Sequence, residues 1–326
     1  MSGAAETSVG LVSTIIPVYN RSGMLREAVA SVVRQTYRPI EIIIVDDGST
    51  DETTRVADEL ASTHPFEVRA LHVLNGGPGW AREAGRQVAR GEFIQYLDSD
   101  DLLWPRKFEL QVRGLRSGPY GVSYGKTRFY HINTGPQDVI EKRTGERITT
   151  MFPSMLLGRW WSTSCPLYRR DLVDQAGPWL SLRSEEDWEY DCRIARQNVR
   201  LHYCPEFVSD TRAHADGLSF PGKVSSMRLK DRTLAHELIL VHAKHAGFGP
   251  DNAEMQHFAR ELFLLARQCG AAGLPDEAKR LFGLAREASG PKRACGIDFL
   301  AYRAAAGVLG WTLAGRVACS LDALKP

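Results

Sequence analysis

The chain has 326 residues, of which 43% are hydrophobic and 25% are charged, and its formal net charge is +2. These are ordinary values for a globular protein, and the length allows one large domain or two. The small net charge argues against a general attraction to nucleic acid, and six scattered cysteines without a C-x-x-C pair argue against a disulfide framework or a zinc site.

The first ten residues lack the basic start and the apolar centre of a signal peptide. We find no uninterrupted run of about 18 apolar residues, the length that a membrane-spanning helix needs. The sequence therefore predicts a soluble cytoplasmic protein with reduced thiols.

Strands and helices alternate over the first hundred residues. Short apolar runs rich in β-branched residues predict strands at 12–19, 40–45, 68–74 and 92–97. Apolar residues three and four apart predict a helix from Met24 to Val33 and another with Trp80 and Ala89 on its buried face. Between these two, Ser49 and Glu52 form an S-x-x-E capping box that opens a further helix. Such alternation is typical of an α/β fold with a doubly wound, mostly parallel sheet.

The pattern changes twice further along the chain. Residues 119–152 form short pieces, followed by predicted strands at 160–168 and 199–208 and a helix at 185–197. Four helices then predict a C-terminal helical extension, at 225–246, 253–269, 275–288 and 299–324. We divide the chain into a flexible N-terminus (1–10), two sheet-forming regions (11–118 and 119–220) and a helical region (221–326).

Acidic residues follow two of the predicted strands. Asp46 and Asp47 end one strand, and Asp98, Asp100 and Asp101 end another. Ligands of parallel α/β sheets bind beyond the carboxyl ends of the strands, so both clusters are expected at one edge. Carboxylates that share a small volume repel each other unless a cation neutralises them, and oxygen ligands suit Mg²⁺ or Mn²⁺. Two capped acidic turns are the alternative, but their convergence favours a cation site for a phosphate-bearing substrate.

Four motifs occur in order at strand ends: IIPVYN at 15–20, IIVDDGSTD at 43–51, GPGWAR at 77–82 and DSDD at 98–101. Together they resemble the family 2 glycosyltransferases, closely over residues 11–105 and more loosely to about 220. The resemblance implies a glycosyltransferase-A, Rossmann-like fold and inverting transfer of a sugar from a nucleoside diphosphate donor, expected to be a UDP-sugar, to an acceptor hydroxyl. Mn²⁺ or Mg²⁺ is the implied cofactor, and residues 11–118 and 119–220 become the donor and acceptor halves.

The resemblance also implies which residues bind the nucleotide: Pro17, Val18, Tyr19, Asn20, Asp46, Asp47, Arg82, Asp98 and Ser99. The first four would form a wall of the nucleoside pocket. Asp46 or Asp47 would accept a hydrogen bond from the base or the ribose, and Asp98 would bind the ribose. Arg82, near a helix N-terminus, is suited to pair with phosphate. Here the family's Ala-Arg-Asn reads Ala-Arg-Glu, and Glu83 either faces solvent or orients Arg82.

By the same resemblance, Asp100 is the metal ligand, and Asp101 supports it or caps a helix. His214 lies in a late R-x-H segment and is a further candidate for the metal or the diphosphate. The acceptor hydroxyl needs a general base, for which we choose Asp187, with Glu186 as the alternative. Trp179 and Trp188 could stack on a sugar. An acidic first helical turn is the non-catalytic alternative for Glu186 and Asp187.

The expected partners are a nucleotide-sugar donor and a saccharide, lipid-linked or small-molecule acceptor, as in the synthesis of a polysaccharide, glycolipid or other glycoconjugate. Residues 300–324 mix apolar and basic side chains, so they either pack on the catalytic domain or lie peripherally on the inner face of a membrane. A homodimer also stays open. The alternative function is a nucleotide-sugar-binding scaffold or sensor without transferase activity. A nucleotidyltransferase would need a glycine-rich basic loop near Pro17, and a dehalogenase-type phosphatase would need Thr at Leu102.

Overall fold

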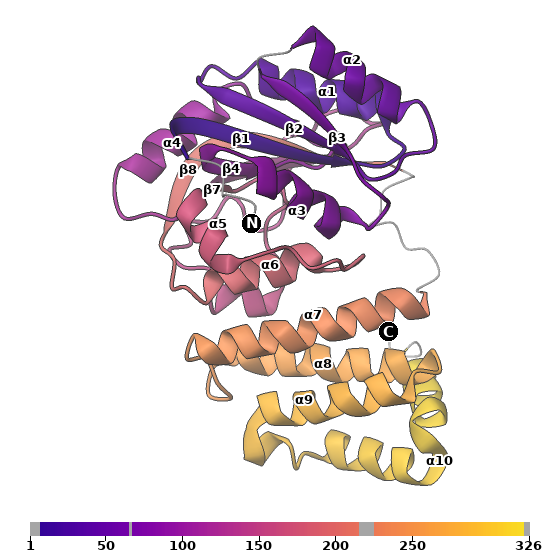
Figure 1. The fold of residues 1–326 in the computed structure, drawn as a ribbon. Coiled ribbons are helices and arrows are strands. Elements are labelled where there is room, and N and C mark those ends of the chain that lie inside the picture. The colour runs from indigo at the N-terminus through magenta and orange to yellow at the C-terminus, as the bar shows by residue number, and fades with distance from the viewer. Residues whose placement is uncertain (1–6, 65–66, 215–224, 323–326) are drawn as a thin grey trace, which may run out of the picture. The chain divides into compact units, whose positions relative to one another are not determined.

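The computed structural model describes residues 7–64, 67–214 and 225–322 (Figure 1). The chain forms two compact units. The first, which we call the sheet unit, consists of Met1–Met151, Trp160–Tyr190 and Val199–Phe220. The second, the helical unit, consists of Phe152–Arg159, Asp191–Asn198 and Pro221–Pro326. Region 11–118 and most of region 119–220 fall in the sheet unit, whereas 221–326 falls in the helical unit together with residues 152–159 and 191–198.

An eight-stranded sheet with the order β3-β2-β1-β4-β7-β6-β8-β5 forms the centre of the sheet unit. Its strands are β1 (Ser8–Val18), β2 (Ile40–Asp46), β3 (Val68–His72), β4 (Gly91–Tyr96), β5 (Leu102–Leu103), β6 (Val122–His131), β7 (Leu167–Arg169) and β8 (Leu201–Ala213). The first four strands pair in parallel, as do β6 and β8, whereas β7 and β5 are antiparallel to their neighbours. The predicted α/β class with a mostly parallel sheet is therefore confirmed.

Helices cover both faces of the parallel part of the sheet, with α1 and α2 on one side and α3 on the other (Figure 1). The sheet unit contains the helices α1 (Ser22–Val33), α2 (Thr53–Thr63), α3 (Pro78–Val88), α4 (Lys107–Arg116) and α5 (Arg170–Ala176), together with the first half of α6 (Glu186–Ala195), which continues into the helical unit at Asp191. All seven residues of β2 are buried, the pattern of a strand covered on both faces. A Cβ atom at Gly85 of α3 would lie 2.4 Å from Cγ2 of Ile15, so glycine permits the close contact between α3 and β1.

Two details of the predicted helices are wrong. The Ser49–Glu52 capping box does not form, because the Ser49 amide donates to Asp46 Oδ1 (2.9 Å) and Glu52 Oε1 accepts from Ser22 (2.9 Å). Instead, Asp51 Oδ1 accepts from the Thr53 amide (2.9 Å) at the start of α2. Trp80 is 43% exposed and does not share the buried face of α3.

The predicted strand at 160–168 is also mostly wrong, since β7 begins only at Leu167. The preceding residues turn, with the Cys165 amide donating to the Ser162 carbonyl (3.1 Å). Trp160 and Trp161 instead pack against Tyr124, with ring centroids 5.1 and 5.6 Å away. Burial of large aromatic rings therefore accounts for the apolar pattern that resembled a strand.

The helical unit contains the short 3₁₀ helix η1 (Ser154–Leu157), α7 (Ser226–His245), α8 (Ala253–Ala271), α9 (Pro275–Arg293) and α10 (Ile297–Asp322). Gly290 and Gly310 have φ of 75° and 76° and interrupt α9 and α10. Among the described helices, α10 alone has the length and apolar composition of a membrane span, with a mean hydropathy of 1.3 over a window that is 17% buried. The sequence was expected to contain no segment suited to span a membrane, and α10 corrects that expectation by its length and composition. Arg303 and Arg316 interrupt its apolar residues, so it contains no uninterrupted apolar run of about 18 residues.

Candidate active site

The carboxyl ends of β2 and β4 carry the two acidic clusters, as predicted. Further polar groups come from α3 (Arg82), the start of α6 (Glu186 and Asp187) and the end of β8 (His214). Residues more than a hundred positions apart are thereby brought into hydrogen-bond contact in the sheet unit.

Asp46 and Asp47 are almost fully buried and fix the loops around the end of β2. Asp46 accepts from the Ser49 amide (2.9 Å) and the Thr54 hydroxyl (2.6 Å). Burial disfavours the charged form of Asp46, but these hydrogen bonds outweigh it and hold its pKa below the usual value. Asp47 accepts from the amides of Gly76 and Gly77 at 2.8 and 2.9 Å. Burial nevertheless raises the pKa of Asp47.

The wall predicted from Pro17 to Asn20 lies at the end of β1. Pro17 and Val18 are buried, whereas Tyr19 is 46% exposed and presents an aromatic ring at the edge of the sheet. Asn20 has φ of 51° and its Oδ1 accepts from the Thr50 amide at 2.8 Å. This contact ties the end of β1 to the loop after β2. Contact with a nucleoside stays a prediction for these residues and for Asp46 and Asp47.

Arg82 is buried and joins two acidic segments. Its Nη2 is 2.7 Å from Asp98 Oδ1, and its Nη1 is 2.8 Å from Glu186 Oε1. Its guanidinium also lies 4.9 Å from the ring centroid of Trp179. Despite burial, Asp98 and Glu186 raise the pKa of Arg82 above its usual value. The predicted phosphate contact of Arg82 is untested, and the observed geometry makes this residue a positioning group.

Glu83 neither faces solvent nor orients Arg82, which corrects both expectations. It is 6% exposed, and its carboxylate pairs with Arg86 (2.8 Å) and accepts from the Trp179 amide (3.1 Å). Trp179 itself is 5% exposed and stacks on Tyr190 with 3.9 Å between ring centroids. Trp179 is therefore part of the core beneath the site and not a free platform for a sugar.

Asp100 and His214, the predicted metal ligands, converge. His214 Nε2 lies 2.9 Å from Asp100 Oδ2, and Arg21 Nη1 lies 2.5 Å from the same oxygen. His214 Nδ1 is buried and has no hydrogen-bond partner among the described residues. No cluster of three or more His, Cys, Asp or Glu with metal-binding geometry occurs within residues 7–64, 67–214 and 225–322. The carboxylate and imidazole fit a divalent ion whose remaining ligands are supplied by substrate and water.

Two arginines complete this group: Arg21, which the sequence did not single out, and Arg212, the arginine of the R-x-H segment. Arg21, directly after the PVYN motif, contacts Asp100 as described. Arg212 donates from Nε to the Asp100 carbonyl (2.5 Å) and from its amide to Asp101 Oδ1 (3.2 Å). Asp101 also accepts from the Ser164 hydroxyl at 2.7 Å, and burial raises its pKa well above the usual value. Asp101 thus supports the loop from the interior, while Ser99 is buried beside it.

The candidate bases have different surroundings. Glu186 is 7% exposed and is held by Arg82, and burial followed by repulsion from Asp187 raises its pKa to about 7. Asp187 is only partly buried, and its Oδ1 accepts from the Trp188 amide at 2.7 Å. The structure therefore places Asp187 in the more accessible position of the two.

A mostly parallel α/β sheet with an Asp-x-Asp segment and a second acidic group at its edge is the arrangement expected of a nucleotide-sugar-dependent glycosyltransferase. The model of the glycosyl transferase family 2 matches residues 13–176, and the chain belongs to that family.

Two relatives match between a third and a half of the chain. An uncharacterized glycosyltransferase of Rickettsia felis is 34% identical over 156 residues, 48% of this chain and 24% of the relative. The chain thus spans about a quarter of that relative's length. Glycosyltransferase GlyG of Streptococcus pneumoniae is 44% identical over 126 residues, 38% of this chain and 42% of the relative.

Solved structures extend the similarity of fold to the helical extension. TarS of S. aureus in complex with UDP matches with a TM-score of 0.67 and 19% identity, covering 95% of this chain and 91% of that chain. A mannosyltransferase of Pyrobaculum calidifontis in complex with GDP-Man and Mn²⁺ matches with a TM-score of 0.51 and 18% identity, covering 95% and 86%. These similarities confirm the predicted glycosyltransferase-A-like fold.

Proposed function

We propose that the protein transfers a sugar, with inversion, from a UDP-sugar to an acceptor hydroxyl, with Asp187 as the general base. One observation carries this proposal. Two adjacent carboxylates lie at the start of α6, and Asp187 is accessible whereas Glu186 is held by Arg82. A base must reach the acceptor proton, which a partly exposed Asp187 can do and a buried, ion-paired Glu186 cannot do without breaking its pair. The UDP in the TarS structure supports the choice of nucleotide.

The chain's own residues organise the reaction around this base. Arg82 joins the Asp98 segment to α6 through two ion pairs, so it holds the donor edge and the base in one arrangement. Arg212 and Asp101 fix the backbone at Asp100. We infer that Tyr19 supplies the flat surface for the uracil ring, because it is the exposed aromatic group at the end of β1.

We further propose that Asp100 and His214 hold Mn²⁺ or Mg²⁺. When bound there, the ion would neutralise the negative charge that develops on the departing diphosphate. Arg21 shares Asp100 Oδ2 with His214, so we expect it to turn toward the phosphates as a second cation. The Mn²⁺ of the mannosyltransferase structure supports this proposal.

A donor screen tests the proposed function. We expect UDP-sugars with Mn²⁺ to raise the melting temperature, because a ligand that binds only the folded state stabilises it by mass action. ADP- and GDP-sugars serve as matched controls. Release of UDP with saccharide, lipid-linked or small-molecule acceptors then identifies the acceptor class. Donor binding without release of UDP in any acceptor mixture would instead support a sensor or scaffold.

A further inference from the structure

The inner and outer faces of α10 differ sharply. The inner face packs within the helical unit, where Phe299 stacks on Phe263 with 4.7 Å between ring centroids. Gly315 lies so close to α8 that a Cβ atom would be 2.5 Å from the Ala271 amide nitrogen. The outer face carries large apolar side chains in contact with solvent, including Val308 at 85% exposure and Leu313 at 47%. An apolar stripe of this length on a packed helix indicates an interaction surface.

The interrupted backbone argues against a transmembrane path for α10. Gly310 has φ of 76° and ψ of 157°, which divides the helix into segments of about 13 and 12 residues. Each segment is about 20 Å long at 1.5 Å per residue, shorter than the hydrocarbon core of a bilayer, which is about 30 Å thick. Figure 1 shows the chain changing direction within α10.

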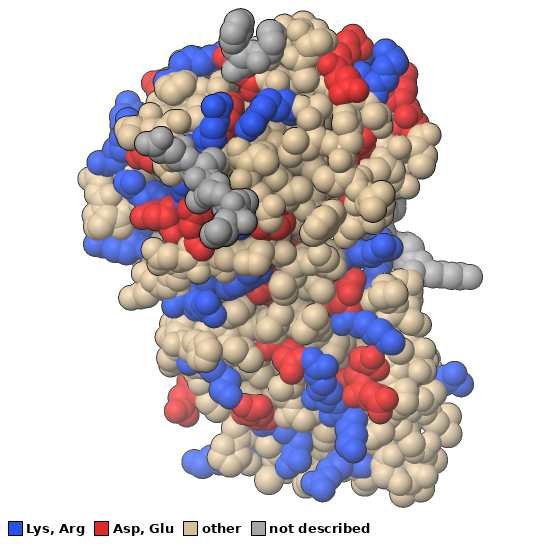
Figure 2. Space-filling view, viewed as in Figure 1, with Lys and Arg blue, Asp and Glu red and all other residues tan. Residues whose placement is uncertain are grey.

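The charges near the outer face favour an anionic partner. From Phe299 to Leu321 the sequence has no Asp or Glu, and its two charged residues are the exposed Arg303 and Arg316. Residues 221–326 hold 15 Lys and Arg against 10 Asp and Glu. Figure 2 shows basic and acidic side chains interspersed over the helical unit and an uncharged area toward its lower right, where α10 lies.

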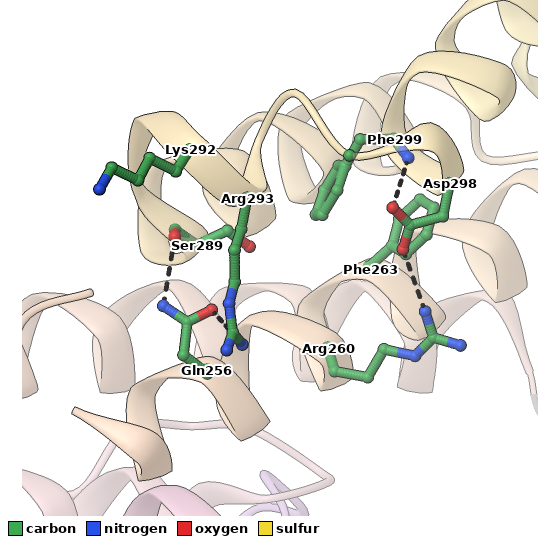
Figure 3. Close-up of a pocket in the computed structure, with 9 residues that line it drawn as sticks. Gln256, Arg260, Phe263, Ser289, Lys292, Arg293, Asp298 and Phe299 are labelled. Carbon is green, nitrogen blue, oxygen red and sulfur yellow. Dashed lines mark hydrogen bonds and ion pairs between the residues drawn. The ribbon is translucent and has the colours of Figure 1, made fainter. Parts of the chain in front are cut away.

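A basic cavity adjoins the first turn of α10. It has a volume of about 400 Å³, and three cationic residues (Arg260, Lys292 and Arg293) line it against one acid, Asp298 (Figure 3). Lys292 and Arg293 follow Gly290, which interrupts α9, and Arg293 Nη1 donates to Gln256 Oε1 at 3.0 Å, whereas the Lys292 side chain extends away from the other lining residues (Figure 3). Arg260 is 3.4 Å from Asp298, so the site retains an excess of positive charge. Phe299 lines the same cavity, which connects the basic site to the start of α10.

We propose that the helical unit binds peripherally to an anionic lipid surface through the outer face of α10, with the basic cavity receiving phosphate oxygens of lipid headgroups. Apolar side chains next to cationic ones are the combination that stabilises an amphipathic helix at a membrane interface. A second copy of the chain would satisfy the apolar face but would leave the excess of cations at the cavity unpaired. An anionic bilayer would both cover the apolar face of α10 and pair with the cations at the cavity.

Vesicle flotation of the full chain tests this proposal. We expect binding to vesicles in which a third of the phosphatidylcholine is replaced by phosphatidylglycerol, and little binding to pure phosphatidylcholine. Val308→Glu should abolish binding, because it places a carboxylate in the apolar face. Val9→Glu is the matched control, since Val9 is also 85% exposed but lies in the sheet unit, and it should bind as the wild type does.

A second pair of variants tests the cavity. Lys292→Glu should reduce binding at least fivefold, since each basic residue near an anionic surface contributes about that factor. Lys279→Glu, before the interruption at Gly290, should change binding less than twofold, because the helical stretch from Lys279 to Ser289 alone spans about 15 Å, beyond the Debye length of about 8 Å. Free inorganic phosphate is tested in place of the vesicles, and with it we expect no difference between the wild type and Val308→Glu.

Three results would overturn the proposal. The full chain could fail to bind anionic vesicles, or Val308→Glu could bind as well as Val9→Glu. Light scattering could also reveal a dimer that Val308→Glu dissociates, without vesicle binding, which would assign the face to a second copy. Thermal unfolding of each variant confirms that it is folded. UDP release with a soluble acceptor is measured in parallel, so failure of lipid binding and failure of transferase activity are distinguished.

Discussion

Arg82 illustrates how a buried residue can join distant parts of a site. Its guanidinium is buried and paired with Asp98 and Glu186, which belong to segments far apart in the sequence. Removing it would leave Glu186 buried without its counter-charge, and that is more costly than losing an exposed ion pair.

We therefore expect Arg82→Met to lower the free energy of unfolding by about 3–5 kcal/mol. Arg55→Met is the control, because Arg55 is mostly exposed and pairs with the exposed Glu52 and Glu59, and it should cost less than about 1 kcal/mol. Urea unfolding measures both. Equal effects of the two variants would refute a positioning role for Arg82.

Lys107 provides a pH-dependent test of the core. Its side chain is fully buried, its Nζ donates to the Cys165 carbonyl at 2.7 Å, and burial lowers its pKa to about 7. Between pH 7 and the unfolded pKa of about 10.4, the unfolded chain holds a proton that the folded chain does not. Stability should therefore rise with pH above 7, by an amount on the order of a few kcal/mol in total.

Lys107→Met should flatten this dependence, because it removes the titrating group. Gln111 Nε2 also donates to the Cys165 carbonyl (3.1 Å), so that acceptor keeps a partner in the variant. Thermal melting at pH 7, 8 and 9 compares the two proteins. If the stability of Lys107→Met rises with pH as steeply as that of the wild type, other groups produce the pH dependence.

At the scale of elements, glycines set the distance between α3 and the sheet. Gly85→Ala should cost about 1–3 kcal/mol, because its Cβ would meet Ile15 at 2.4 Å and overpack a buried contact. Gly23→Ala is the matched control in α1, where nothing lies within 4 Å, and it should stabilise by about 0.5–1 kcal/mol. Urea unfolding measures the change in the free energy of unfolding for each variant. Stabilisation by Gly85→Ala would contradict the described packing of α3 against β1.

Sequence patterns predicted elements well where burial follows a regular period. The fully buried β2 and the amphipathic α1 are examples, since apolar runs and three-and-four spacings reflect local geometry. The patterns failed where long-range contacts decide. Ser49 could equally cap a helix or donate its amide to Asp46, and the structure shows the second. Glu83 and Arg86 have the i, i+3 spacing of a helical ion pair, but nothing near Glu83 in the sequence reveals that the Trp179 amide also uses its carboxylate.

The same distinction applies to the site. Asp100 and His214 were expected together on the basis of family motifs, and they do lie 2.9 Å apart. Arg21 was not expected, because an arginine after a strand has no distinctive spacing, and Arg212 was noted only as part of the R-x-H segment, without a contact to Asp100. Only the folded arrangement brings both to Asp100.

At the scale of the whole molecule, the helical unit includes segments from inside the catalytic region. Met155 and Leu156 of η1 are fully buried, and Phe152 lies 5.8 Å from Phe248 between ring centroids. We expect a chain that ends at Phe220 to expose these residues and to bind the dye ANS, with reduced solubility. A monomeric truncated chain with an unchanged melting temperature and no ANS binding would contradict this dependence.

The most direct test of the central claim is single-turnover UDP release by Asp187→Asn in the presence of Mn²⁺, the identified donor and its acceptor. We expect transfer to fall by at least about a hundredfold, the usual contribution of a general base, while donor binding measured by thermal shift stays the same. Asp100→Ala is the contrasting variant, which should weaken both donor binding and transfer. Wild-type transfer rates in Asp187→Asn would contradict the proposed mechanism.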